Sequence, residues 1–144
     1  DHKVRHDLLQ QLAARMKSPV PTALVDREID RRLEEFVRRL MDQGMDPMKA
    51  GVDWQEFRER QQEPSAETVK STLVLDEIAR RENIDASEED VAKEVDQFAE
   101  RSGRTSAAVR ARLEKEGGVS RIRSGIRREK TVTFLLEKAN ISNG

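Results

Sequence analysis

Apolar residues recur at helical spacing along almost the whole chain, and turn-forming residues separate the helical stretches. The first stripe has four members spaced four residues apart: Val4, Leu8, Leu12 and Met16. Residues 18–21 (SPVP) end this stripe, because each proline lacks an amide hydrogen and disfavours a helical conformation in the residue before it. Thr22 is then expected to cap a second helix.

The second predicted helix is long and highly charged. Its apolar positions form a narrow seam: Val25, Ile29, Leu33, Phe36, Val37, Leu40 and Met41. It is expected to end near Gln43, since Gly44 tolerates the positive φ that is common just past a helix. Residues 44–53 are predicted to form a loop that exposes two methionines, and Asp53 is predicted to cap a short helix carrying Trp54 and Phe57.

Pro64 lies where a helix is expected to kink or restart, and Ser65 with Thr68 is compatible with a new first turn. The stretch that follows has the broadest apolar face of the chain, made of Val69, Thr72, Leu73, Val74, Leu75 and Ile78. We expect this stretch to be the most core-like.

Three shorter helical segments complete the pattern. Residues 84–86 are predicted to be an extended link, and residues 87–90 (SEED) resemble a capping box. The next helix carries Val91, Val95, Phe98 and Ala99 and ends at Gly103. A short helix with Val109 and Leu113 follows. It is capped by Thr105 or Ser106 and ends at Gly117-Gly118. The last helix has the apolar positions Val119, Ile122, Ile126, Val132, Leu135 and Leu136, and is expected to stop near Asn140, with Ile141 as a short apolar tail.

These elements predict an all-α fold, because no alternating β-branched stretch of useful length occurs. Only 35% of the 144 residues are hydrophobic and 38% are charged, against about 25% charged in typical domains, so we expect an elongated multi-helix domain with helical arms. The predicted single domain, 1–144, has a lead-in helix at 1–18, long arm helices at 22–62 and a compact cluster at 65–141. The chain is interpreted as a piece of a longer protein.

Charge and composition exclude several classes of function. The net charge is −1, from 27 basic and 28 acidic side chains that are intermixed, so no single-sign field favours nucleic acid or a membrane surface. Five basic residues gather on the last helix, Arg121, Arg123, Arg127, Arg128 and Lys130, but core positions interleave with them and no aromatic residue is near for stacking. No apolar run approaches the ~20 residues that span a bilayer.

The sequence offers little material for catalysis. It has no cysteine and two histidines, His2 and His6, which lie four apart with no third metal ligand near them. Most carboxylates stand three or four residues from an arginine or lysine, a spacing typical of solvated helix faces. No glycine pattern predicts a phosphate-binding loop. We therefore expect no catalytic residue, no cofactor and no metal.

Seven apolar residues near the end of the second helix have the least obvious burial: Phe36, Leu40, Met41, Met45, Met48, Trp54 and Phe57. Methionine is flexible and polarisable, and proteins that bind many partners over-use it on their binding surfaces. Two interpretations stay open: these residues pack the tip of a helical hairpin, or they form an exposed binding patch, and both can hold in part.

Several stretches resemble the C-terminal domain of the trigger factor family, the ribosome-associated chaperones of bacteria. Residues 20–30 (VPTALVDREID) are similar to the start of that family's arm helix, residues 69–84 (VKSTLVLDEIARRENI) to its core helix, and residues 128–139 (REKTVTFLLEKA) to its closing helix. Residues 4–8 (VRHDL) resemble the segment that follows the family's isomerase domain. The resemblance covers nearly the whole chain in the same order.

This resemblance implies a bacterial cytoplasmic chaperone that holds unfolded or nascent polypeptides without ATP, in a cradle of helical arms. Ribosome binding and prolyl isomerisation belong to other domains of the family and are not expected of this chain. The alternative hypothesis is an assembly module, for instance a homodimer, whose arm surface pairs with one fixed protein partner.

Overall fold

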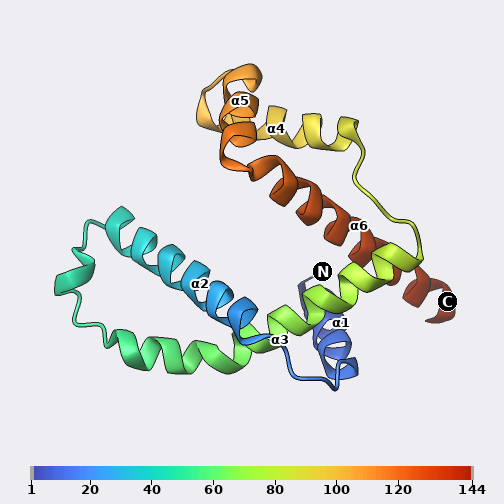
Figure 1. The fold of residues 1–144 in the computed structure, drawn as a ribbon, viewed down its shortest axis with the longest axis horizontal. Helices are drawn as coiled ribbons and strands as arrows, with labels where there is room; N and C mark the ends of the chain where they lie inside the picture. The colour runs from blue at the N-terminus through green and yellow to red at the C-terminus, as the bar shows by residue number, and fades with distance from the viewer. Residues whose placement is uncertain (1, 144) are drawn as a thin grey trace. The chain divides into compact units, whose positions relative to one another are not determined.

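A computed structural model describes the backbone of residues 2–143 and the side chains up to residue 139. Within this range the chain forms helices and no strand, which confirms the predicted all-α class (Figure 1). The elements are α1 (His2–Arg15), α2 (Thr22–Asp42), the 3₁₀ turn η1 (Pro47–Lys49), α3 (Trp54–Arg81), α4 (Glu88–Ser102), α5 (Ser106–Glu116) and α6 (Gly118–Asn143). None of the described helices is long and apolar enough to cross a membrane.

The chain divides into two compact units, Asp1–Val74 and Leu75–Gly144. The first unit contains α1, α2, η1 and most of α3, and the second contains the end of α3 and the helices α4 to α6. Each unit has its own buried cluster of apolar side chains. Each unit is therefore described by itself.

The core of the first unit lies where α2 packs on α3. Val25, Ile29 and Val69 are buried there, and four partly buried residues pack against them: Val20, Leu24, Ala66 and Leu73. The predicted cap at Thr22 is wrong, because α2 begins at Thr22 itself and Pro21 occupies the cap position without a side-chain hydrogen bond. The Pro21 carbonyl instead accepts the Leu24 and Val25 amides at 3.1 and 3.3 Å.

Helix α3 is one continuous helix of 28 residues that contains Pro64. Asp53 caps it as predicted, since its Oδ1 accepts the Glu56 amide at 3.1 Å, but the predicted restart after Pro64 does not occur. Ser65 is fully buried inside the helix instead of starting a new turn. A proline removes only one helical hydrogen bond, and contacts from α2 on both sides of Pro64 hold the helix through this point.

The core of the second unit lies between α4, α5 and α6, which contact each other in all three pairs (Figure 1). Its buried cluster consists of Val91, Val95, Ala99 and Val109. The capping box is confirmed, since Ser87 Oγ accepts the Asp90 amide at 3.0 Å and Asp90 Oδ2 accepts the Ser87 amide at 2.9 Å. Helix α6 continues to Asn143, past the predicted end near Asn140; the side chain of Ile141 lies outside the described residues.

The first turn of α4 gathers cations from the later helices. Lys130 Nζ donates to Asp90 Oδ2 at 2.5 Å and to the Asp85 carbonyl at 3.1 Å. The hydrogen bonds from Lys130 and from Ser87 lower the pKa of Asp90 to about 2. Glu88 pairs with Arg123 and with Arg110, and these hydrogen bonds also lower its pKa. The start of α4 is thus joined by ion pairs to α5 and α6.

This arrangement predicts acid sensitivity of the second unit. Because the folded pKa of Asp90 is below its unfolded value near 3.8, its stabilising effect is present above about pH 4 and is lost as the pH falls towards 2. Asp90→Asn is expected to lower the urea midpoint at pH 6 and to make it less dependent on pH, as followed by circular dichroism. The control is Asp96→Asn, an exposed carboxylate on the same helix. Equal pH profiles for Asp90→Asn and the parent protein would contradict the prediction.

Candidate functional site

The tip of the α2–α3 hairpin, residues 33–57, contains all seven predicted binding residues, and hydrogen bonds hold its loop at the α2 end and in the middle. At the end of α2 the amides of Gly44 and Met45 donate to the carbonyls of Met41 and Leu40, each at 2.9 Å, with Gly44 at φ 78°. In the middle of the loop, Asp46 Oδ1 accepts the Met48 amide at 2.9 Å and caps η1. The loop therefore has a defined backbone that fixes where its side chains project.

Three aromatic rings join the two helices at the tip. Phe36 of α2 stacks on Phe57 of α3 with centroids 5.2 Å apart, and meets the edge of Trp54 at 6.0 Å. Trp54 and Phe57 contact each other edge-on at 6.5 Å. The three rings are half-buried, and Leu40 beside them is only 7% exposed. These four residues pack the hairpin tip, as the first of the two interpretations predicted.

The three methionines of the tip are exposed, unlike the rings. Met41 is 61% exposed, Met45 is 44% exposed and Met48 is 86% exposed. They come from the end of α2, from the loop and from η1, the same hairpin tip that holds the aromatic cluster. These three are the members of the predicted set whose side chains are exposed, as the second interpretation requires.

Helix α2 has a second apolar stripe, which the single seam predicted for this helix includes. Leu33, Val37 and Met41 are four residues apart, and they line a surface hollow of about 410 Å³ together with Glu34, Arg38 and Asp42. The other stripe, with the buried residues Val25, Ile29 and Leu40 and the half-buried Phe36, lies on the adjacent face. The four-residue spacing of Leu33, Val37 and Met41 is the sequence signal for this second stripe.

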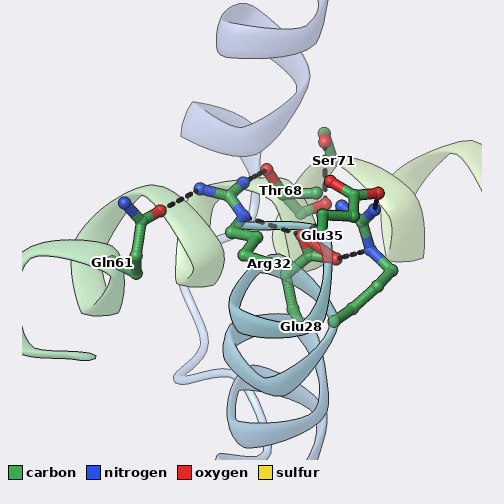
Figure 2. A network of polar contacts seen from close by, with 7 residues as sticks. Glu28, Arg32, Glu35, Gln61, Thr68 and Ser71 are labelled. Atoms are coloured by element: carbon green, nitrogen blue, oxygen red, sulfur yellow. Dashed lines mark hydrogen bonds and ion pairs between the residues drawn. The ribbon is translucent and has the colours of Figure 1, made fainter. Parts of the chain in front are cut away.

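A hydrogen-bond network fixes α2 against α3 below the tip (Figure 2). Arg32 of α2 donates from Nη1 to Gln61 Oε1 at 2.9 Å and from Nη2 to Thr68 Oγ1 at 2.8 Å. Gln61 and Thr68 precede and follow Pro64 in the sequence, and Figure 2 shows both acceptors at the guanidinium of Arg32. Arg32 therefore connects α2 to both halves of α3 through one planar group.

Glu28 holds Arg32 in this position. The Nε of Arg32 donates to Glu28 Oε2 at 2.9 Å, and Arg31 donates to both Glu28 oxygens at 2.8 and 2.9 Å. Burial raises the pKa of Glu28, but the hydrogen bonds from the two arginines outweigh burial, so the pKa lies below its ordinary value. Glu28 thus stays ionised at neutral pH and orients the Arg32 guanidinium.

Loss of Arg32 is expected to destabilise the hairpin. Arg32→Ala removes three charged-group hydrogen bonds in a partly buried setting, and we expect a loss of about 1–3 kcal/mol in the free energy of unfolding. Arg32→Lys is expected to recover only the contact with Glu28. The matched control is Arg31→Ala, because Arg31 also bonds Glu28 but its side chain is 55% exposed; we expect a change below about 1 kcal/mol. Urea unfolding followed by Trp54 fluorescence measures both, and equal losses would contradict the special role of Arg32.

Four of the five basic residues predicted on this helix donate hydrogen bonds within the second unit. Arg128 donates to both carboxylate oxygens of Asp76 at 3.0 and 3.1 Å, Arg127 donates to the Asp76 carbonyl at 3.4 Å, and Lys130 and Arg123 hold the start of α4. These contacts occupy four of the five cations that the sequence offers to a phosphate backbone on this helix. In the described part of the chain, no group of three His, Cys, Asp or Glu side chains is arranged for a metal ion.

The second unit has a larger hollow of its own. It measures about 660 Å³ and lies along α6 beside Glu94 of α4, with Ile122, Ile126 and Phe134 as its apolar lining. Lys138 Nζ lies 4.8 Å from the Phe134 ring centroid. The family resemblance predicts Phe134 in the closing helix but gives no sign of the hollow that it lines.

The chain is similar to known proteins over nearly its full length. Residues 1–137 match the family model described as the C-terminus of bacterial trigger factor protein. Trigger factor of Solibacter usitatus is 35% identical over 95% of this chain, and trigger factor of Koribacter versatilis is 36% identical over 96%. A solved structure of trigger factor domains from Thermotoga maritima has the same fold, with a TM-score of 0.65 and 20% identity over 94% of this chain and 81% of that chain.

The curated relatives are longer than the matched region. The alignment covers 32% of the Solibacter protein and 32% of the Koribacter protein. The chain therefore spans about one third of the length of the relatives that it matches.

Proposed function

The chain belongs to the family of the bacterial trigger factor C-terminus, and from this premise we propose that it is a chaperone domain that holds unfolded or nascent polypeptides. In this proposal it acts in the bacterial cytoplasm without ATP or another cofactor, and it assists folding by covering apolar segments of its clients. The seven residues at the hairpin tip have different roles. Met41, Met45 and Met48 contact clients, while Phe36, Leu40, Trp54 and Phe57 form the support beneath them.

The exposure of the three methionines is the observation that supports this proposal most directly. Isolated apolar residues on a surface are ordinary, but here three lie within eight positions of one another, at the end of α2 and in the loop after it. A thioether side chain adapts its shape to different partners, so such a surface tolerates many client sequences. The hollow beside Leu33 and Val37 extends the apolar surface from Met41 along α2.

The expected affinity is modest. A micromolar dissociation constant corresponds to about −8 kcal/mol. A few methionine and aromatic contacts can supply that after the client has lost conformational freedom. Weak binding of this kind suits a holding function, because a client must be released in order to fold.

The test is a titration of the isotope-labelled chain with a reduced, alkylated protein that cannot refold. We expect changes in backbone amide shifts within residues 33–57, with the native form of the same test protein as a control that gives none. A second readout is the emission of Trp54, the only tryptophan of the chain. Absence of shifts at high client concentration, or shifts confined to the charged helix faces, would overturn the proposal.

The assembly-module hypothesis is not favoured by membership of this family. Sedimentation at several protein concentrations separates the two ideas, because a fixed homodimer that buries Trp54 would be stoichiometric and would ignore unfolded proteins. A client-binding domain is expected to bind unfolded proteins of unrelated sequence at the same tip.

A further inference from the structure

The end of α4 carries an aromatic residue that the second unit does not cover. Phe98 continues the apolar stripe of α4, but it is 50% exposed, whereas Val91 and Val95 of the same stripe are 0% and 2% exposed. Val109 of α5 joins the buried cluster beside Ala99 and leaves Phe98 at its edge. The apolar stripe of α4 is thus wider than the surface that α5 and α6 bury.

Phe98 lines a hollow of about 410 Å³ between the end of α4 and α5. Its apolar lining is Phe98, Val109 and Leu113, and its polar lining includes Arg104, Arg112 and Glu116. A volume of this order lies within the range of about 300–1,000 Å³ that is usual for sites of small ligands. The hollow is therefore large enough for one or two bulky side chains of a short segment.

The charges of this hollow do not cancel. Glu116 accepts from Arg112 Nε at 3.2 Å, so that carboxylate is already paired. Arg104 is exposed and has no ion pair with any residue in the described part of the chain. One cation next to an apolar surface is thus available to a ligand.

The backbone of Arg104 is fixed although its side chain is not. Its amide donates to the Ala99 carbonyl at 3.0 Å, directly after Gly103, which has φ 68° and ends α4. Thr105, the next residue, caps α5 through its Oγ1 at 3.2 Å from the Ala108 amide. Two helix ends therefore hold Arg104 at the rim of the hollow, where its guanidinium can form two parallel hydrogen bonds with a carboxylate.

We propose that this hollow docks a short segment of another protein in which a leucine or aromatic side chain stands next to an aspartate or glutamate. The apolar side chain contacts Phe98 and Leu113, and the neighbouring carboxylate pairs with Arg104. The charge of the hollow selects such a segment over a basic one with the same apolar residues. This surface is separate from the hairpin tip and does not rest on the client-binding proposal.

Three decapeptides test the proposal with the whole chain. They share one Leu-Phe pair in a neutral, soluble frame and differ only in the two flanking residues, which are Glu, Gln or Lys. We expect the Glu peptide to shift amides within residues 98–116 and to bind about tenfold more tightly than the Lys peptide at low salt. Arg104→Glu is expected to reverse this order, and the exposed control Arg121→Glu is expected to leave it unchanged.

Circular dichroism verifies that both variants keep their helices, and Arg104→Gln serves as a milder second variant that should make the three peptides equal. The proposal is overturned if the three peptides bind the parent chain equally, if the Glu peptide gives no shift at millimolar concentration, or if its shifts lie outside residues 98–116. It is also overturned if the preference for the Glu peptide survives in Arg104→Glu.

Discussion

Replacement of Met41, Met45 and Met48 together by glutamine is expected to weaken the binding of an unfolded protein by about tenfold to fiftyfold. Full burial of a methionine side chain contributes about 1.5–3 kcal/mol, and a client that covers part of each exposed side chain recovers about half of that. Three such losses raise the dissociation constant by a large factor, because every 1.4 kcal/mol is tenfold. The expected factor is smaller than the product of the three, because contacts in one patch are not additive. Glutamine keeps the length and the helix propensity of methionine, so the fold is expected to stay intact.

The control for this triple variant is Val4→Gln. Val4 is 50% exposed on α1, in the same unit but outside the tip. Its replacement therefore removes exposed apolar surface away from the proposed binding residues. We expect unchanged client binding for Val4→Gln, and urea midpoints for both variants close to that of the parent chain. If the triple variant bound the unfolded protein as tightly as Val4→Gln does, the methionines would not be the client-binding surface.

Local hydrogen-bonding signals were sufficient to predict most helix ends. The capping box of Ser87 and Asp90, the cap at Asp53 and the stop at Gly103 depend only on residues within one turn, and all three are confirmed. The prediction of a cap at Thr22 failed because two residues that can start a helix are adjacent here. Pro21 occupies the cap position, since its carbonyl accepts the first helical hydrogen bonds and its φ is fixed by the ring.

The restart that was one of the two alternatives predicted at Pro64 does not occur, for a different reason. By local rules, a proline within a helical pattern predicts a break in the helix. Here α3 is held together by contacts with residues that are distant in sequence. Arg32 is separated from Gln61 by 29 positions and from Thr68 by 36. Periodicity contains no information about such partners, so the continuity of α3 could not be predicted.

The predicted binding residues divide into a covered group and an exposed group, and the sequence could not separate the two for a related reason. Helical spacing shows that Phe36, Leu40 and Met41 are apolar positions on one helix, but it does not show which face α3 covers. The structure places Phe36 and Leu40 on the covered face and leaves Met41 exposed, with Leu33 and Val37 beside it. The sequence could therefore locate the tip, and the structure was needed to separate its support from its exposed surface.

The hairpin keeps its stability and its exposed patch in different places. Val25, Ile29 and Val69 form the core at its base, Arg32 connects the helices at mid-length, and the rings of Phe36 and Phe57 join them at the tip. Because none of these contacts uses the three methionines, the methionines are free to contact other molecules. The dense charge of the helices keeps such a surface soluble.

Ile29→Ala is therefore expected to have the largest effect on stability in the first unit. Ile29 is 1% exposed between Val25 and Val69, and the replacement leaves a cavity that this small cluster cannot close. We expect a loss of about 2–4 kcal/mol in the free energy of unfolding. That is a large part of the roughly 5–15 kcal/mol typical of a whole protein. Urea unfolding followed by Trp54 fluorescence reports on this unit, because Trp54 lies in the hairpin.

A graded series separates the cavity from other effects of substitution. Ile29→Val removes one methylene group, and we expect a loss of about 0.5–1.5 kcal/mol. Asp26→Ala changes an exposed neighbour on α2, and we expect a change within about 0.5 kcal/mol. If Ile29→Ala were as stable as Asp26→Ala, the base cluster would not hold the hairpin, and the aromatic tip would have to do so. In that case the tip would be both the core of the hairpin and the support of its binding surface. The aromatic residues, and not Ile29, would then set the position of the methionines.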